Sequence, residues 1–447
     1  MKHSYNGALL IGLATLCLLA YGPVHAADNL LDVYRQARLT DPALKASDAS
    51  RRAVQEAKPQ SLALLLPNIQ ATGNIDRLRL KQRGSGGSTS YGTNKVYSVS
   101  LVQTLFNQDQ FIQFVQANSR IAQAEADYGA AEQDLIVRTA EAYFNVLAAM
   151  DDLELARANK KAAERQLDQA TQRFEVGLIP ITDAQESEAR YDLAISTEIQ
   201  AESDLESARD ALLEVTGVSY SQLFRVREDL ELVRPDPDVP EDWVKTAMNQ
   251  NLSVLAAKAA VETARQQIKR QRAGHLPTLD AEASWSYRNQ DQFLSAFPLE
   301  RNDSSIGIQL NVPLYEGGLI SSQTREARYR YDEALELMDQ QRRITERQTR
   351  DAFRGVIFSI SQVQALAQAV VSTKTAYQAA EAGFEVGTRT SVDVLDAERE
   401  RLRANSEYLR SRYDYLLNTL RLKRAVGTLS VADVEHINSF LIDQKPN

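Results

Sequence analysis

Cysteine is almost absent from this chain, and its one copy, Cys17, lies near the N-terminus. Residues 1–26 have the features of a signal peptide, because Lys2 supplies a positive end, residues 8–20 are apolar and residues 24–26 form a small-residue cleavage site. Cleavage there would leave no thiol, which excludes disulfides, thiolate catalysis and cysteine metal ligands. Leu16 is too large to precede a lipidated cysteine, so no lipid anchor is expected.

Histidine is also scarce, and after the signal peptide only His275 and His436 remain. The chain has no glycine-rich phosphate loop and no paired-histidine metal motif. We therefore expect neither an enzyme nor a cofactor. A hydrolase that uses carboxylates alone stays open at this point, although the repeat described below offers it no pocket.

Basic stripes and long hydrophobic runs are missing as well. The net charge is −9 with 25% charged residues, which disfavours nucleic-acid binding because phosphates need a cluster of cations. After residue 27 we expect no window with the apolar length of a transmembrane helix, which takes about 20 residues. If the mature chain enters a membrane, the sequence predicts that it does so as β-strands.

What the chain does contain is an internal repeat. The sequence RFEVG at residues 173–177 returns as GFEVG at residues 383–387, 210 positions later, and Gly217 returns as Gly427. A constant offset indicates duplicated structural units. We predict a first repeat over residues 27–217 and a second over residues 241–427. The linker at 218–240 and the tail at 428–447 are expected to lie around the middle of the molecule.

Each repeat contains a predicted β-hairpin, at residues 68–106 and 278–315. Polar and apolar side chains alternate along both, most clearly at 278–288. Each run has roughly ten residues, about the length of a strand that crosses an outer membrane. The aromatic residues predicted to lie at the membrane interface are Tyr97, Trp285 and Tyr287. A soluble β-sandwich with one buried face per sheet is the alternative.

Four strands cannot form a closed membrane barrel. In lipid, the edges of an open sheet would leave unpaired backbone groups, so the chain is expected to oligomerise. A dimer would give eight strands and an interior filled by side chains, whereas a trimer gives twelve strands and a pore.

The rest of the chain is predicted to be helical. Residues 107–175 and 316–385 contain no proline, and each helix would be roughly 100 Å long. Apolar residues at 136, 140, 143, 147 and 150 have coiled-coil spacing. Shorter helices are expected at residues 29–60, 181–216, 243–272 and 391–426. The predicted fold is a mixed α and β trimer, a twelve-stranded barrel continued by a helical tube, and the alternative is a rod-like coiled coil without a channel.

The turns that end the long helices are the candidate working end. Gly177 and Gly387 are predicted to reverse the chain at positive φ, and Thr182 with Gln185 resembles a capping box. Asp393 and Asp396 are three apart and share one helix face. In a trimer they would form two carboxylate rings, but they could equally stabilise the helix N-terminus or form a solvated surface.

Several longer runs resemble the TolC family of outer-membrane channel proteins. They are LDVYRQAR at 31–38, AYFNVL at 142–147, RQLDQ at 165–169, GHLPTLD at 274–280 and TRTSVDVLDA at 388–397. The resemblance implies a homotrimer in the cell outer membrane, with a twelve-stranded barrel and a periplasmic helical tunnel. It implies a passive exit duct for drug efflux and type I protein secretion. The implied partners are periplasmic adaptor proteins, inner-membrane transporters of the RND, ABC and MFS types, and outer-membrane lipid. A duct dedicated to one efflux or secretion system is the closest alternative.

The resemblance also implies roles for individual residues. Asp393 and Asp396 correspond to a periplasmic constriction, which is expected to favour cations and attract multivalent ones. The implied gate links join Arg389 to Gln166, Thr182, Asp183, Glu381 and Phe384. The implied adaptor-binding residues are Gly177, Leu178, Gly387 and Thr388. Phe384 stands where close relatives often carry tyrosine, so a phenol hydrogen bond to Asp183 is lost and closure is expected to be weaker or to depend more on Arg389.

Overall fold

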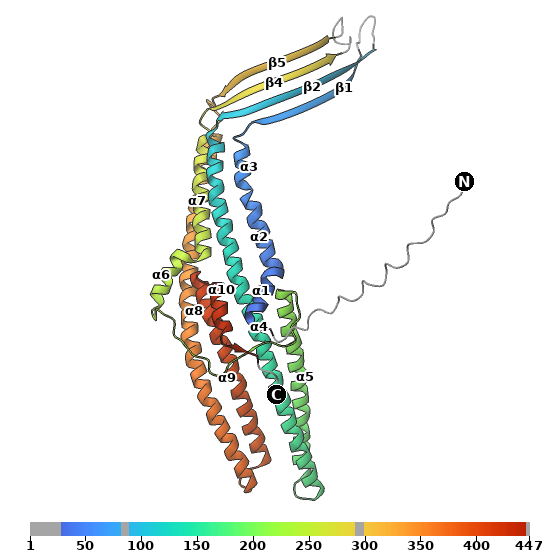
Figure 1. Ribbon diagram of the computed structural model, residues 1–447, viewed down its shortest axis with the longest axis vertical. Helices are drawn as coiled ribbons and strands as arrows, with labels where there is room; N and C mark the ends of the chain where they lie inside the picture. The colour runs from blue at the N-terminus through green and yellow to red at the C-terminus, as the bar shows by residue number, and fades with distance from the viewer. Residues whose placement is uncertain (1–27, 82–88, 291–298, 444–447) are drawn as a thin grey trace, which may run out of the picture.

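A computed structural model describes residues 28–81, 89–290 and 299–443. The predicted signal peptide, residues 1–26, lies outside the described residues, as do residues 444–447 of the predicted tail. The chain is elongated, with a four-stranded sheet at one end and two helical turns at the other (Figure 1). The elements are α1 Leu30–Thr40, α2 Pro42–Gln55, α3 Ala57–Ala63, β1 Asn68–Lys81, β2 Thr89–Phe106, α4 Gln108–Glu175, α5 Ile181–Thr216, β3 Arg225–Val226, α6 Pro240–Gln250, α7 Leu252–Ala273, β4 Thr278–Gln290, β5 Leu299–Asn311, α8 Leu319–Glu385, α9 Ser391–Val426, α10 Val431–Asn438 and β6 Leu441–Ile442.

The two long helices are present as predicted. α4 has 68 residues and α8 has 67. Asn107 caps α4 by accepting a hydrogen bond from the backbone N–H of Gln110 at 3.3 Å, and α8 begins after two glycines at positive φ. Of the predicted coiled-coil positions, Ile136, Ala140 and Tyr143 are buried. The apolar spacing therefore identified the packed face of α4 correctly.

The two shorter helices that lead into the hairpins are interrupted, which the sequence prediction missed. Residues 29–60 were expected to form one helix but break at Asp41 and again at Glu56, and residues 243–272 break at Asn251. The side chain of Asp41 accepts from the N–H of Leu44 at 2.8 Å, and that of Asn251 accepts from Val254 at 3.1 Å. The same cap thus occurs at the same position of each repeat and starts a new helix there.

α8 is long and apolar enough, by length and composition alone, to cross a membrane. It contains a stretch of 18 mostly apolar residues, of which 22% is buried within the chain. The prediction that no such window exists was therefore wrong, because no charged residue lies between Arg354 and Lys374. One such helix is weak evidence for a membrane span, and α8 packs lengthwise against α9 and α7.

The sheet joins the two repeats in the order β1-β2-β4-β5, antiparallel throughout. Its strands have 14, 18, 13 and 13 residues, which is longer than expected. One row across all four strands consists of Ile69, Leu101, Ala283 and Ile306. The next row, which faces the opposite side, consists of Gln70, Ser100, Ser284 and Ser305. The predicted alternation therefore gives the sheet one apolar and one polar face.

The hydrophobic core lies around the middle of the long axis, where α1, α4, α8, α9 and α10 meet (Figure 1). Tyr143 and Phe144 of α4 are among its largest buried side chains, and the ring of Phe144 stacks on Tyr413 of α9 at 5.6 Å. β3, from the predicted linker, pairs with β6, from the predicted tail. This central region fixes the two helical hairpins, α4–α5 and α8–α9, which extend from it to the turns.

Candidate functional site

The two turns far from the sheet have nearly the same backbone (Figure 1). Gly177 follows the end of α4 and Gly387 follows the end of α8, each at a φ of 77°. In both turns the amide after the glycine donates to a helix carbonyl at 2.8 Å. Positive φ is strained for residues with a Cβ atom, so the glycines were correctly predicted to reverse the chain.

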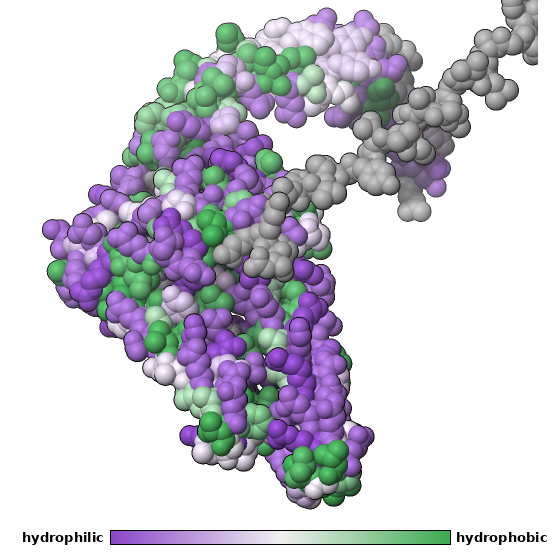
Figure 2. All heavy atoms as spheres, turned by 60° about the horizontal axis from the view of Figure 1, so that its bottom comes forward, coloured by the Kyte–Doolittle hydropathy of each residue, from purple (hydrophilic) through white to green (hydrophobic). Residues whose placement is uncertain are grey.

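The first turn, between α4 and α5, is apolar. Val176, Leu178 and Ile181 are 69%, 73% and 52% exposed. Figure 2 shows a hydrophobic patch at each turn, with the larger one at the α4–α5 turn. An exposed apolar cluster of this kind is typical of a surface that contacts another protein.

The predicted capping box at Thr182 and Gln185 is wrong. The N-cap of α5 is Pro180, which has no side-chain acceptor, and Thr182 lies one residue inside the helix. The hydroxyl of Thr182 instead donates to the carboxylate of Asp183 at 3.2 Å. The return helix of this turn, α5, therefore starts without a side-chain cap.

The second turn, between α8 and α9, also exposes a valine, Val386, but is otherwise more polar and is capped. The backbone N–H of Thr390 donates to the carboxylate of Asp393 at 2.8 Å, and the Thr390 hydroxyl accepts from the Asp393 N–H at 3.2 Å. The hydroxyl of Thr388 donates to the carbonyl of Gly383 at 3.0 Å. These bonds satisfy groups that both helix ends would otherwise expose.

Asp393 therefore has the capping role that the sequence left open. The hydrogen bond from the Thr390 backbone, together with the Thr390 hydroxyl and the nearby charge of Arg389, lowers the pKa of this carboxyl below its usual value. Asp393 consequently stays ionised to lower pH than an ordinary aspartate.

Asp396 lies one turn further along α9 and contacts two guanidinium groups. Its carboxylate is 3.3 Å from Arg190 of α5 and 3.5 Å from Arg399 of its own helix. Arg190 also contacts Glu186 at 2.8 Å. The sequence analysis named neither arginine, and nothing in the local spacing indicates a pair whose members are 206 positions apart.

Within this chain the predicted gate residues lie near the turns, and the bond between the neighbours Thr182 and Asp183 is the one that joins two of them among the described residues. The backbone N–H of Arg389 donates to the carbonyl of Gly383 at 3.1 Å. In the part of the chain that the structure describes, the side chains of Arg389 and Gln166 form no hydrogen bond or ion pair. Glu381 accepts from the hydroxyl of Tyr377 at 3.3 Å. Links from Arg389 to Gln166, Thr182, Asp183 and Glu381 remain a prediction for contacts between copies.

Phe384 has a partner that the sequence did not indicate. The guanidinium carbon of Arg173, on α4, lies 5.2 Å from the centre of the Phe384 ring. A cation over an aromatic face is attracted by the ring. The position that lacks a phenol hydroxyl therefore still connects the two helical hairpins. The side chain of Arg389 crosses Gly383, where a Cβ atom would lie 2.7 Å from Arg389 Cγ.

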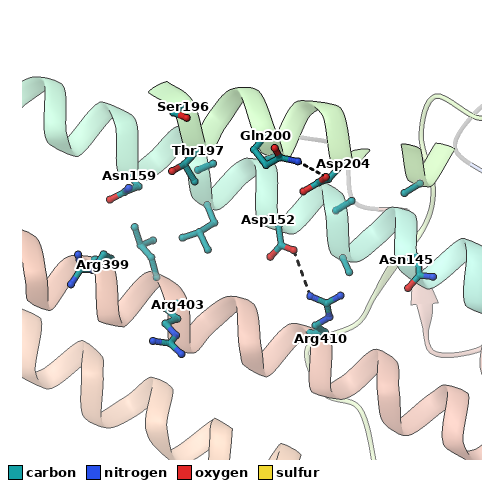
Figure 3. Close-up of a pocket in the computed structure, with 17 residues that line it drawn as sticks. Asn145, Asp152, Asn159, Ser196, Thr197, Gln200, Asp204, Arg399, Arg403 and Arg410 are labelled. Carbon is teal, nitrogen blue, oxygen red and sulfur yellow. Dashed lines mark hydrogen bonds and ion pairs between the residues drawn. The ribbon is translucent and has the colours of Figure 1, made fainter. Parts of the chain in front are cut away.

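A groove of about 980 Å³ separates α4 and α5 from α9 between the turns and the core (Figure 3). Asn159 and Asp152 of α4, Gln200 of α5 and Arg403 of α9 line it. At its core end the carboxylate of Asp152 is 3.9 Å from Arg410 and accepts from the hydroxyl of Ser406 at 2.6 Å. The two hairpins are thus incompletely packed along this stretch.

The predicted aromatic residues lie on the apolar face of the sheet. Tyr97 and Tyr287 are opposite one another on β2 and β4, and their rings stack at 6.3 Å. Gly73 of β1 leaves room for the Tyr97 ring, since a Cβ atom there would lie 3.3 Å from it. Trp285 is exposed on the same face, opposite Val99. Their place at a membrane interface remains a prediction.

No cluster of three or more potential metal ligands is found among the described residues. Asp393 and Asp396 are occupied by a cap and by two arginines, as described above. Any attraction of multivalent cations would require these carboxylates to gather from several copies.

Three comparisons with known proteins agree with this architecture. The family model described as "Outer membrane efflux protein" matches residues 33–218 and again residues 243–428. The chain is 38% identical to the outer membrane protein TolC of Vibrio cholerae serotype O1 over 419 residues, covering 93% of this chain and 94% of that protein. It is 36% identical to TolC of Escherichia coli K12 over 443 residues, covering 97% of this chain and 88% of that protein.

Among solved structures, the Campylobacter jejuni CmeC outer membrane channel superposes with a TM-score of 0.76 at 18% sequence identity, covering 93% of this chain and 90% of that one. The long helices and four antiparallel strands of this chain thus form a TolC-like channel fold, with the family unit present twice. On the family match and the identities to TolC, this chain belongs to the outer membrane efflux protein family, whose members are non-enzymatic channels of the outer membrane.

Proposed function

We propose that three copies of this chain form a passive exit duct that serves drug-efflux pumps and type I secretion systems. The observation that carries the proposal is the open sheet. Within the described chain, β1 and β5 each pair on one side only, and isoleucines such as Ile69, Ile306 and Ile308 are exposed on one face. Unpaired strand edges are unstable in lipid, so these edges favour pairing between copies.

The number of copies follows from the interior that a channel needs. Eight strands give a barrel filled by side chains, whereas twelve leave an open lumen. The polar face of the sheet, which carries hydroxyl pairs such as Thr72 with Ser98 at 2.7 Å, suits a water-filled interior. Three copies of the α4–α5 and α8–α9 hairpins would continue this lumen as a tube.

We further propose that Asp393 and Asp396 line the narrowest part of the tube. The direct test is single-channel conductance in planar bilayers, with wild type compared to Asp393→Ala/Asp396→Ala. We expect wild type to conduct and prefer cations, and the variant to lose much of that preference. If the wild-type protein forms trimers that do not conduct, the alternative of a rod-like coiled coil without a channel would be supported instead.

The turns are proposed to bind the periplasmic adaptor. Gly177 and Gly387 allow close approach of a partner, since a Cβ atom at either would meet no atom within 4 Å. Leu178 adds apolar area to the first turn, and Thr388 occupies the equivalent place in the second. We expect Leu178→Ser to weaken adaptor binding about tenfold, because a largely exposed leucine side chain would lose its burial in the complex. Thr388→Ser is the matched control, and binding is measured by surface plasmon resonance with a purified adaptor.

Whether the duct serves several systems is tested in cells. In a strain that lacks its own outer-membrane efflux channel, we expect this chain to restore both drug resistance and secretion of a type I substrate. Restoration of one alone would favour a duct dedicated to a single system. Each activity that returns would show that the duct works with the corresponding kind of inner-membrane transporter, a drug exporter or a protein exporter, among the RND, ABC and MFS types implied by the resemblance.

A further inference from the structure

Four charged side chains form a continuous chain across the two hairpins. Glu186 contacts Arg190 at 2.8 Å, Arg190 contacts Asp396 at 3.3 Å, and Arg399 contacts Asp396 at 3.5 Å. The charges alternate in sign along this chain. Asp396, expected from the sequence to present a free negative charge, is therefore compensated by two guanidinium groups.

The repeat makes this arrangement asymmetric. Glu186 and Asp396 are equivalent positions, 210 residues apart, and both contact the single guanidinium of Arg190. The position equivalent to Arg190 in the second repeat is Glu400. One hairpin therefore supplies the cation that bridges to the other, and the second hairpin supplies no matching cation in return.

Arg190 also lies where the hairpins have few other connections. Between the groove and the turns, the hydrogen bonds, ion pairs and ring contacts of the described residues join the hairpins at two places only. One is the Arg190–Asp396 pair, and the other is Arg173 over the Phe384 ring. On the core side of the groove the hairpins meet again at Asp152 (Figure 3). Separation of the turns would therefore break these two contacts first.

We propose that Arg190 is a latch that also sets the charge of the constriction. While the hairpins are together, Arg190 holds α5 against α9 and neutralises Asp396. When they separate, the pair breaks and Asp396 keeps only Arg399, so more of its negative charge is uncompensated in the passage. This inference rests on the proposed channel function and adds that opening and cation preference are coupled through one residue.

The coupling follows from the geometry of the pair. An ion pair screens the field of the carboxylate only while the guanidinium remains within a few ångströms. Arg399 lies on the same helix as Asp396 and moves with it, so it cannot respond to separation of the hairpins. Arg190 lies on the other hairpin and does respond.

The test uses full-length protein in planar bilayers and compares Arg190→Gln with Arg399→Gln. Arg190→Gln is expected to raise conductance and to raise the cation-to-anion permeability ratio roughly two- to fivefold, because it removes both the latch and the compensating charge. Arg399→Gln also removes one positive charge beside Asp396, but Arg399 does not connect the two hairpins. This variant should therefore raise the cation-to-anion permeability ratio and leave conductance unchanged. Arg190→Lys should stay close to wild type. Equal conductance changes in the two glutamine variants would overturn the latch.

A second comparison shows whether the selectivity effect passes through Asp396. In an Asp396→Asn background, Arg190→Gln should produce no further change in the permeability ratio. If Arg190→Gln changes the permeability ratio by the same amount in that background, Arg190 does not act by compensating Asp396. The effect would then be assigned to Glu186.

Hydrogen–deuterium exchange separates failure of the latch from failure of the channel proposal. Arg190→Gln should increase exchange at both turns, residues 173–190 and 384–399, and Arg403→Gln, on an arginine that pairs with Glu407 of its own helix at 2.9 Å, should not. This readout does not need conduction. Unchanged exchange at both turns in Arg190→Gln would refute the latch even if the wild type conducts.

Discussion

The two turns share a backbone but differ in almost every interaction made by their side chains. Both reverse at a glycine with a φ of 77°. The first exposes Leu178 and begins its return helix without a side-chain cap, whereas the second uses Thr388 to bond a helix carbonyl and Thr390 to cap α9. The copies have retained the backbone and the sequence FEVG that leads into each turn, and they have diverged in the side chains that follow the glycine.

This divergence suggests a division of work within one chain. An apolar, uncapped turn suits a surface that another protein covers, since little structure is lost when side chains rearrange on binding. A capped polar turn suits an element that must keep its geometry. The bridge from Arg190 to Asp396 then connects the adaptable hairpin to the fixed one. Substitutions at a residue and at its equivalent 210 positions away, or at a residue in the other turn, test this division.

The largest expected difference in stability between the two repeats is at the glycines that end the return helices α5 and α9. Gly217 and Gly427 end α5 and α9 at φ values of 67° and 91°. A Cβ atom at Gly217 would lie 3.5 Å from Thr40, but at Gly427 it would lie 2.4 Å from the carbonyl oxygen of Gln250. Gly217→Ala should cost about 1–2 kcal/mol of unfolding free energy from positive φ alone, and Gly427→Ala about 2–5 kcal/mol because the backbone must also move.

Urea unfolding in detergent, followed by far-UV circular dichroism, measures both glycine variants. Equal losses of unfolding free energy in the two variants would mean that the backbone at the helix break near Asn251 can move to make room for the methyl group at position 427. The two repeats would then be mechanically equivalent at this point.

The next comparison concerns a buried hydrogen bond that only one repeat has. The hydroxyl of Tyr413 donates to the carboxylate of Asp151 at 2.6 Å, and both side chains are buried. The equivalent positions are Ser203 and Ser361, both exposed. Tyr413→Phe should cost about 1.5–3 kcal/mol because Asp151 loses a bond to its charged form. Ser203→Ala should change stability by less than about 0.5 kcal/mol.

The cost of Tyr413→Phe should depend on pH. Burial raises the pKa of Asp151, while the hydrogen bond from Tyr413 and the charge of Arg225 oppose that rise. Removing the hydroxyl raises the pKa further. A folded protein that contains a carboxyl with a raised pKa loses stability as the pH rises through that pKa. The loss of unfolding free energy caused by Tyr413→Phe should therefore be greater at about pH 7 than at about pH 4. A cost independent of pH would show that packing, rather than ionisation, explains the loss.

Much of the architecture was predictable because its causes are local. Long segments without proline, alternation of polar and apolar residues and glycine at a reversal each act within a few neighbouring residues. The breaks at Asp41 and Asn251 were also marked locally, by a capping residue at the same place in each repeat, but the continuous helical pattern around them concealed the signal.

The contacts at the turns were less predictable because they join distant segments. Arg190 and Asp396 are 206 positions apart, and neither residue is unusual in its own helix. Phe384 was interpreted as a lost hydrogen bond, since sequence alone shows which group is missing and not which cation reaches the ring. The capping box was predicted in the wrong turn because Pro180, and not Thr182, is the N-cap of α5, so the helix starts two residues earlier than a cap at Thr182 requires.

The smallest expected effect tests whether the cap makes the second turn rigid. Thr390→Ala removes the hydroxyl that accepts from the Asp393 N–H and should speed hydrogen exchange at residues 392–396 roughly three- to tenfold. Thr182→Ala, which removes only a bond to the neighbouring Asp183 side chain, should change exchange at residues 182–186 less than about twofold. Pro180→Asp would place a capping side chain at the start of α5 and should slow exchange there. If Thr390→Ala leaves the second turn as protected as before, the cap is not the source of the difference, and the hydrogen bond from the Thr388 hydroxyl to the Gly383 carbonyl is the remaining candidate.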